Sequence, residues 1–183
     1  MTQNPYSQPP SPQPPYPQAQ AYYPPPKRSV WPTVIGIISI ILAALGLICT
    51  PLMTIMNTFN PASQQVYEYL PDWYRTWEVV SAFGGIIWGV LLLIAGIGLL
   101  KRRPVARTLH LVYAVSSMVV AVINGFVLVS VLSDTGGMPA PVRVGMIGGA
   151  VGGTCGALIY PVFLLIWFLR ASIAAEVRSW AAE

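Results

Sequence analysis

The sequence predicts an all-α integral membrane protein, in which four transmembrane helices form a bundle and a disordered Pro-rich tail precedes them. Two observations predict this class. Of the 183 residues, 55% are apolar and only 9% are charged, whereas about 25% of the residues in an ordinary soluble domain are charged. Four charge-free stretches also reach the length of about 20 residues that a helix needs to cross a hydrocarbon core. A chain of this size has no soluble core that would bury four such helices.

The first element is the segment of residues 1–28, whose composition excludes a folded core. It holds ten Pro, five Gln and four Tyr, with almost no aliphatic side chain. This composition predicts a disordered, partly polyproline II tail. Its PxxP spacings, such as Pro9 to Pro12, suit an aromatic groove on a protein partner. A solvated spacer is the alternative interpretation of the same residues.

Residues 29–183 form the predicted transmembrane domain. Its four spans are expected at about residues 32–57, 79–100, 108–132 and 144–169. Each span is apolar around its whole circumference, unlike the one-sided stripe of a helix on a soluble core. The spans therefore face lipid as well as one another.

The loop between the first two spans is long enough to hold structure of its own. Val66, Leu70, Trp73 and Trp77 recur at helical spacing. Proline fits the first turn of a helix, so Pro71 predicts one short helix that ends near Leu70 and a second that runs into the next span. The aromatic residues of this loop suit either anchoring at the headgroup level or a surface for a partner or lipid.

Two shorter segments complete the chain. Residues 133–143 hold Asp, Gly and Pro and predict a turn. After the last span, Ile173, Val177 and Trp180 recur at spacings of four and three. This pattern predicts that the C-terminal residues either extend the fourth helix or lie along the inner membrane interface.

The distribution of Lys and Arg predicts the orientation, because short loops rich in these residues stay on the cytoplasmic side. With both termini inside, the outer side keeps only Arg75 and Arg143. The cytoplasmic side carries the other eight cations, among them the topology-setting residues Lys27, Arg28, Lys101, Arg102, Arg103 and Arg107, together with Arg170 and Arg178. These cations border the spans and form no separate basic domain, which argues against nucleic acid as a partner.

Glycines repeat at a spacing of four within the last predicted span. One ridge comprises Gly145, Gly149 and Gly153, and a second comprises Gly148, Gly152 and Gly156. Small residues at this spacing let two helix backbones approach closely in lipid. The ridges therefore predict helix packing, either against another span of the same chain or against a second copy through the second ridge.

Polar groups inside the spans are few and uncharged. Asn124 is the most costly to bury and is the best candidate for a functional intramembrane contact. Pro51 and Pro161 each remove a helical hydrogen bond, and kinked helices build the sites of some transporters. A small-solute transporter or channel is therefore an alternative function.

Catalytic chemistry is not indicated. His110 has no carboxylate or second His near it in the sequence, and Cys49 and Cys155 lack a metal-ligand spacing. No nucleophile and base pair, metal motif or cofactor motif occurs. The sequence predicts a protein that is not an enzyme and holds no metal or cofactor.

The Pro/Gln/Tyr-rich tail, the Lys27-Arg28 pair and the apolar segment that begins at Trp31 resemble those of uncharacterised bacterial tetraspan membrane proteins. The resemblance implies a multi-pass protein of the bacterial inner membrane. Together with the charge-free spans, it leads to the hypothesis of a structural or accessory subunit whose tail meets cytoplasmic partners. The expected partners are membrane lipid, a second copy bound through the glycine ridges, and a protein bound by the tail.

Overall fold

The structure is a computed structural model that describes residues 29–134 and 137–180, and these residues are helical apart from short connections. The tail of residues 1–28, including Lys27 and Arg28, lies outside the described residues. The helices are α1 (Trp31–Phe59), α2 (Pro61–Tyr67), α3 (Asp72–Leu100), α4 (Val105–Asp134), α5 (Ala140–Phe168) and α6 (Ala171–Ser179).

Four of these helices, α1, α3, α4 and α5, are long and apolar enough to cross a membrane. They coincide with the four predicted spans and extend most of them by a few residues. Large apolar side chains point outward along all four, as with Ile48 at 64%, Phe126 at 71% and Ile159 at 72% exposure. Such exposure is costly in water and favourable in lipid, so the all-helical fold suits a bilayer.

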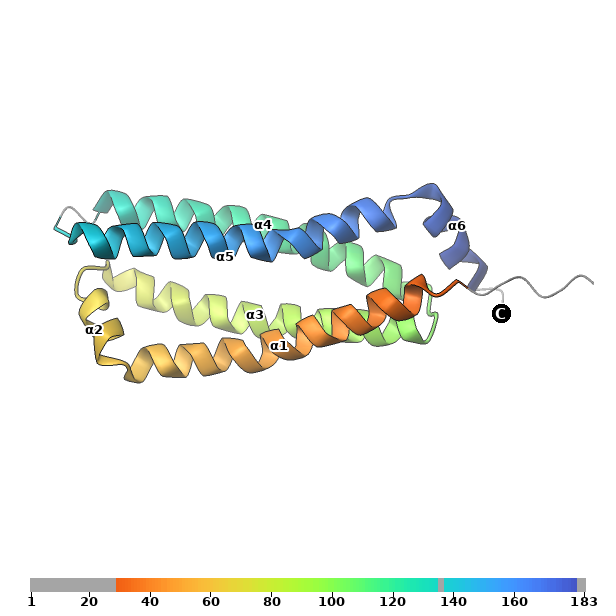
Figure 1. Cartoon of the computed structure of the whole chain (residues 1–183), viewed down its shortest axis with the longest axis horizontal. Helices are drawn as coiled ribbons and strands as arrows, with labels where there is room; N and C mark the ends of the chain where they lie inside the picture. Colours follow the sequence, from red (N-terminus) through yellow and green to blue (C-terminus); the bar gives the residue numbers. More distant parts are fainter. Residues whose placement is uncertain (1–28, 135–136, 181–183) are drawn as a thin grey trace, which may run out of the picture.

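The long helices form two adjoining pairs, as Figure 1 shows. Helix α1 lies along α3, α4 lies along α5, and α3 also lies along α4. Helix α2 connects α1 and α3 at one end of the bundle, and α6 crosses the opposite end near the start of α1. We call these the α2 end and the α6 end.

Helix boundaries follow local sequence signals. The Asn60 side chain accepts a hydrogen bond from the Ala62 amide at 3.0 Å and caps α2. Pro71 is the N-cap of α3, which confirms the predicted short helix followed by a second one. Helix α3 ends with Arg102 at a φ of 50°, and the Arg103 amide donates to the Gly98 carbonyl at 2.9 Å. Arginine thus occupies a left-handed position that glycine usually takes.

The C-terminal residues do not extend the fourth span. Arg170 has a ψ of 131° and breaks the helix between α5 and α6, so the first of the two predicted alternatives, an extension of the fourth helix, is wrong. The predicted face is nevertheless used, because Ile173, Val177 and Trp180 are buried at 8%, 3% and 7% exposure. Helix α6 therefore folds back over the end of the bundle.

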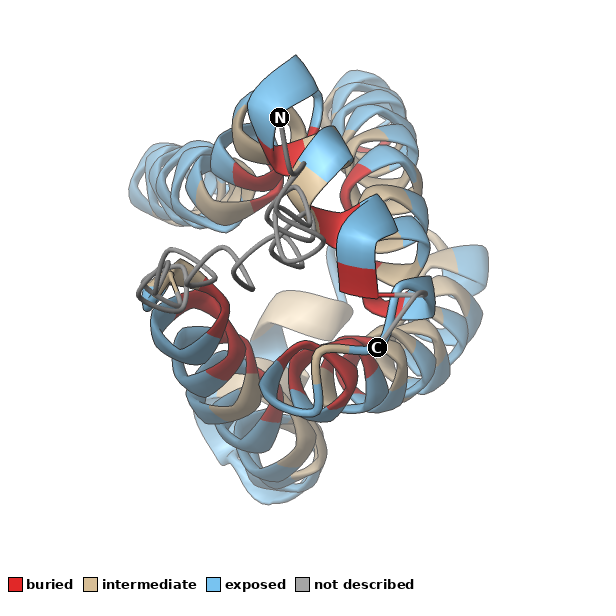
Figure 2. Cartoon of the chain, turned by 90° about the vertical axis from the view of Figure 1, so that its right-hand side faces the viewer, coloured by how far each residue is buried: buried red, intermediate tan, exposed pale blue. Residues whose placement is uncertain are grey.

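The best-packed part of the interior lies toward the α6 end. Figure 2 views the bundle from that end, and the buried residues face the centre. Leu99 of α3, Leu164 of α5 and Phe168 of α5 are fully buried there, and the α6 residues pack in the same cluster. This cluster closes the α6 end of the bundle.

Candidate functional site

A buried polar cluster links three helices within the packed half of the bundle. Ser39 of α1 lies with its Oγ 2.9 Å from His110 Nε2 of α4 and 2.6 Å from Tyr160 Oη of α5. Ser39 and His110 are both fully buried. The three residues are far apart in the sequence, so this cluster ties the α1/α3 pair to the α4/α5 pair.

Hydrogen-bond donors and acceptors in the cluster fix the arrangement for a neutral imidazole. His110 Nδ1 lies 2.8 Å from the Ala106 carbonyl, which only accepts, so Nδ1 carries the hydrogen. Nε2 then accepts a hydrogen bond from the Ser39 hydroxyl, and the Tyr160 hydroxyl donates a hydrogen bond to Ser39 Oγ. The Ile35 carbonyl lies 2.9 Å from the same hydroxyl, so one hydrogen has two acceptors within reach.

An aromatic layer covers this cluster on the side of the α6 end. The ring centroids of His110 and Phe168 are 5.1 Å apart, and Phe168 meets Trp31 edge-on at 5.9 Å. Trp31 in turn stacks on Trp180 of α6 at 5.7 Å. Aromatic pairs at such distances add stabilisation beyond their buried area, so the layer forms a continuous plug.

Polar contacts hold α6 on this plug. Glu176 accepts a hydrogen bond from Trp31 Nε1 at 2.7 Å and another from the Ser29 hydroxyl. Arg107 donates twice to the Phe168 carbonyl, at 3.1 and 3.0 Å, and so satisfies the free end of α5. The start of α1 is therefore joined to the C-terminal helix.

A cavity of about 560 Å³ occupies the middle of the bundle and continues toward the α2 end. All four long helices contribute to it: Thr50 from α1, residues 77–88 from α3, residues 117–124 from α4 and residues 153–157 from α5. None of its lining residues is charged. The fully buried residues near Ser39 and Phe168 separate this cavity from the α6 end.

Several polar side chains of the cavity wall have no hydrogen-bond partner in the described part of the chain. Thr50, Ser81, Asn124, Thr154 and Trp77 all line the cavity and are half-buried. Within residues 29–134 and 137–180, none of their side chains makes a hydrogen bond. The neighbouring Trp88 is satisfied, because its Nε1 donates to Ser116 Oγ at 2.7 Å. The cavity thus presents unpaired hydrogen-bonding groups from all four long helices.

The predicted intramembrane contact residue lies in this cavity, and the two predicted kink residues do not line it. Asn124 is part of the wall, whereas Pro51 and Pro161 are absent from it. Pro161 is fully buried in the interior of α5. The structure therefore places Asn124 in the same cavity wall as Thr50 and Thr154, which lie on other helices.

The glycine ridges of α5 do not pack against another helix within the described part of the chain. A Cβ placed on any of them would meet no heavy atom within 4 Å, and this holds for Gly145, Gly148, Gly149, Gly152, Gly153 and Gly156. Intrachain packing, one of the two predicted roles, is therefore not seen in the structure. Gly153 lines the cavity, and the second ridge stays on the outer surface.

Close helix contacts instead use glycines in α1 and α3. A Cβ on Gly89 would lie 2.9 Å from Leu47, and a Cβ on Gly36 would lie 3.0 Å from the Gly96 carbonyl oxygen. The sequence analysis favoured the ridges of α5 over these positions. The spacing of Gly89 and Gly96, seven residues, would have placed them on one helix face.

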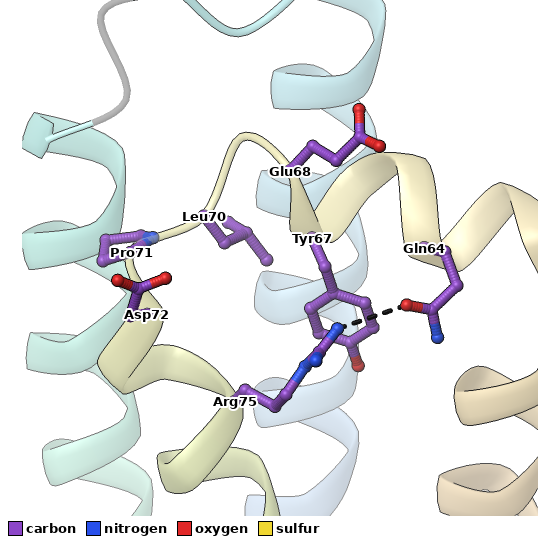
Figure 3. A pocket seen from close by; sticks show the side chains of 7 residues that line it. All are labelled: Gln64, Tyr67, Glu68, Leu70, Pro71, Asp72 and Arg75. Carbon is purple, nitrogen blue, oxygen red and sulfur yellow. Dashed lines mark hydrogen bonds between the residues drawn. The ribbon is translucent and has the colours of Figure 1, made fainter.

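A smaller, polar pocket lies at the α2 end and is shown in Figure 3. Arg75 donates to Gln64 Oε1 at 3.2 Å, and its guanidinium lies 5.2 Å from the centre of the Tyr67 ring. Tyr67 donates a hydrogen bond to Glu78. Burial, followed by this hydrogen bond and by the charge of Glu78, raises the pKa of Tyr67 well above its ordinary value. These contacts fasten α2 to the start of α3.

The described cations of the predicted cytoplasmic set gather near the α6 end. Lys101, Arg102 and Arg103 form the connection between α3 and α4, and Arg102 donates to the Ser29 carbonyl at 2.9 Å. Arg75, by contrast, lies at the α2 end. The charge asymmetry that predicts the orientation is therefore an asymmetry between the two ends of the bundle.

No group of three or more His, Cys, Asp or Glu residues suited to a metal ion occurs within the described ranges. Comparison with protein families, with curated proteins and with solved structures finds no match to this chain. The site is therefore defined by its own geometry: a largely apolar cavity with a few polar groups and one packed end.

Proposed function

We propose that this chain is a non-enzymatic, multi-pass accessory subunit of a bacterial inner membrane, with both termini in the cytoplasm. The closed α6 end carries the proposal. A transporter or channel needs a polar path through the membrane, and here Phe168, Leu164 and Leu99 are fully buried across the bundle. This closed end favours the accessory role over the transporter or channel considered from Pro51 and Pro161.

The association surface of the proposed subunit is the second glycine ridge, Gly148, Gly152 and Gly156. It is exposed and has open space in front of every glycine. In lipid, such a face gains dispersion contacts when another helix backbone approaches it. The proposed occupant is α5 of a second copy. Cys155 is exposed and shares this helix face, which provides a reporter.

Oxidative cross-linking in membranes tests this association. In a Cys49→Ser variant, Cys155 is the remaining thiol, and a copper catalyst should give a disulfide-linked dimer. Gly152→Leu should abolish that dimer, because the added side chain holds the two backbones apart. Gly125→Leu is the matched control, since a Cβ there also meets nothing within 4 Å. A dimer that persists in Gly152→Leu would exclude the ridge as the interface.

The predicted orientation has its own experiment. A cysteine introduced at Ser63 of α2 should react with a membrane-impermeant reagent only from the outer side. Reaction only from the cytoplasmic side would reverse the proposed topology. Because the four candidate spans are unaffected by that reversal, the result would correct the orientation alone.

The proposed tail interaction concerns residues 1–28. Affinity purification in mild detergent, with and without these residues, should recover cytoplasmic partners only with the full chain. Recovery of the same partners by the shortened chain would remove the tail from the mechanism and leave a solvated spacer.

A further inference from the structure

The cavity between the four long helices has the character of a ligand site rather than of a packing defect. Its volume of about 560 Å³ lies within the range of about 300 to 1,000 Å³ that is usual for small-molecule pockets. Its wall combines apolar side chains, such as Val80, Val120 and Ile123, with a few polar ones. Small-molecule sites characteristically combine these two kinds of wall.

The unpaired polar groups point to what the cavity holds. Placing a polar group inside a bilayer without a hydrogen-bond partner is energetically unfavourable. Thr50, Asn124 and Thr154 come from three different helices, line one cavity and make no hydrogen bond within the described ranges. Their hydroxyl and amide groups both donate and accept. A bound molecule with hydroxyl or carbonyl groups would satisfy them.

The charge and shape of the wall restrict the ligand further. A charged group at this depth requires a partner of opposite charge, and the wall offers none. Trp77 and Trp88 supply broad apolar surfaces next to the polar groups. Gly153 lines the same wall, and a Cβ placed on it would meet no heavy atom within 4 Å. The occupant is therefore uncharged and partly apolar.

We propose that the cavity binds an uncharged amphiphile, with its hydroxyl or carbonyl groups at Thr50, Asn124 and Thr154 and its apolar part against Trp77 and Trp88. The packed α6 end closes the cavity on that side, so the ligand enters and leaves on the side away from the α6 end. This binding is independent of the association through α5, because the second glycine ridge does not line the cavity.

Photolabelling of the full chain in phosphatidylcholine nanodiscs tests the site. The probe is a short-chain monoacylglycerol that carries a diazirine, and the corresponding diazirine fatty acid is the charged comparison. The expected result is labelling on residues of the wall, such as Trp88 and Asn124, that excess unlabelled monoacylglycerol removes. Excess unlabelled monoacylglycerol should not reduce the labelling by the diazirine fatty acid. Labelling that is spread over outward residues, such as Val122 and Phe126, and that resists competition would overturn the proposal.

Two substitutions locate the polar contact. Thr154→Val keeps the shape of the side chain and removes its hydroxyl, and Asn124→Leu removes the amide. Each should lower the competable labelling about tenfold, as expected for the loss of one buried hydrogen bond. Gly125→Leu adds the same side chain one residue from Asn124 in open space and should leave labelling unchanged. Equal labelling in Thr154→Val and the unsubstituted chain would exclude the assigned contact, and this variant is the one least disposed to misfold.

Discussion

Gly36 of α1 and Gly96 of α3 bring their backbones into direct contact. A Cβ on either residue would lie 3.0 Å from the carbonyl oxygen of the other. This reciprocal approach explains why α1 and α3 run together along their length, because helices in lipid associate through close packing and not through exclusion of water. Gly89 and Leu47 extend the same contact toward the middle of the bundle.

The first prediction concerns this contact. Gly96→Ala should destabilise the protein, because the new methyl group meets the Gly36 carbonyl and Ser39 Cβ, each at 3.0 Å. Gly46→Ala is the control, since a Cβ there has open space and both variants gain the same helix propensity. Their free energies of unfolding in mixed detergent should therefore differ by about 1 to 3 kcal/mol, the usual cost of overpacking. Equal stabilities would mean that the two backbones are farther apart.

The second prediction concerns the polar cluster at Ser39. Ser39→Ala removes the partner of both the buried His110 imidazole and the half-buried Tyr160 hydroxyl. We expect a loss of about 1 to 3 kcal/mol in the free energy of unfolding. Ser133→Ala is the control, because its hydroxyl bonds only to the Ser130 carbonyl in its own helix.

A double-mutant cycle separates the cluster from a simple volume effect. If Ser39 and Tyr160 act through one hydrogen bond, the losses from Ser39→Ala and Tyr160→Phe should sum to more than the loss in the double variant. Additive losses would show that the two side chains contribute independently.

Sequence reasoning predicted what depends on length, charge and local periodicity. The four long apolar helices and the start of a helix after Pro71 are of this kind. It did not predict which faces meet. A glycine ridge shows that close approach is possible, but Gly149 belongs to such a ridge and Gly96 has no glycine four residues away. Only the tertiary arrangement gives Gly96 a partner and leaves Gly149 without one.

The same distinction explains His110. Its sequence neighbourhood holds the basic connection and no carboxylate or second His, so the sequence indicated no role for it. Its side-chain partner Ser39 is 71 residues away on α1, and Tyr160, which bonds to the same serine, lies on α5. The separation of α6 from α5 was only one of two predicted alternatives for a similar reason, since Trp180 stacks on Trp31, which is 149 residues away in the sequence.

The third prediction concerns α6. Trp180 stacks on Trp31 and is 7% exposed, so Trp180→Ala should release α6 from the bundle. Cleavage by trypsin after Arg170 should then become at least about tenfold faster, which corresponds to a loss of about 1.4 kcal/mol in docking. Ser172→Ala, on the exposed side of α6, should leave the rate unchanged. An unchanged rate in Trp180→Ala would mean that α6 docks without this stack.

The last prediction concerns pH and the α2 end. Burial, then the hydrogen bond to Glu78 and its charge, raises the pKa of Tyr67 above its ordinary value of 10.0. Above pH 10 the unfolded chain loses the phenol proton while the folded chain keeps it, so the stability that Tyr67 contributes is present below pH 10 and falls as pH rises.

Absorbance titration checks this directly. The difference spectrum between the unsubstituted chain and Tyr67→Phe should lack a phenolate transition near pH 10, and the transition should appear only at higher pH. Glu78→Gln should shift it back toward 10, because the substitution removes the negative charge that opposes ionisation. The free energy of unfolding should fall more steeply above pH 10 in the unsubstituted chain than in Tyr67→Phe. A Tyr67 transition near pH 10 in the unsubstituted chain would mean that Tyr67 is open to water and that α2 is not fastened to Glu78 of α3.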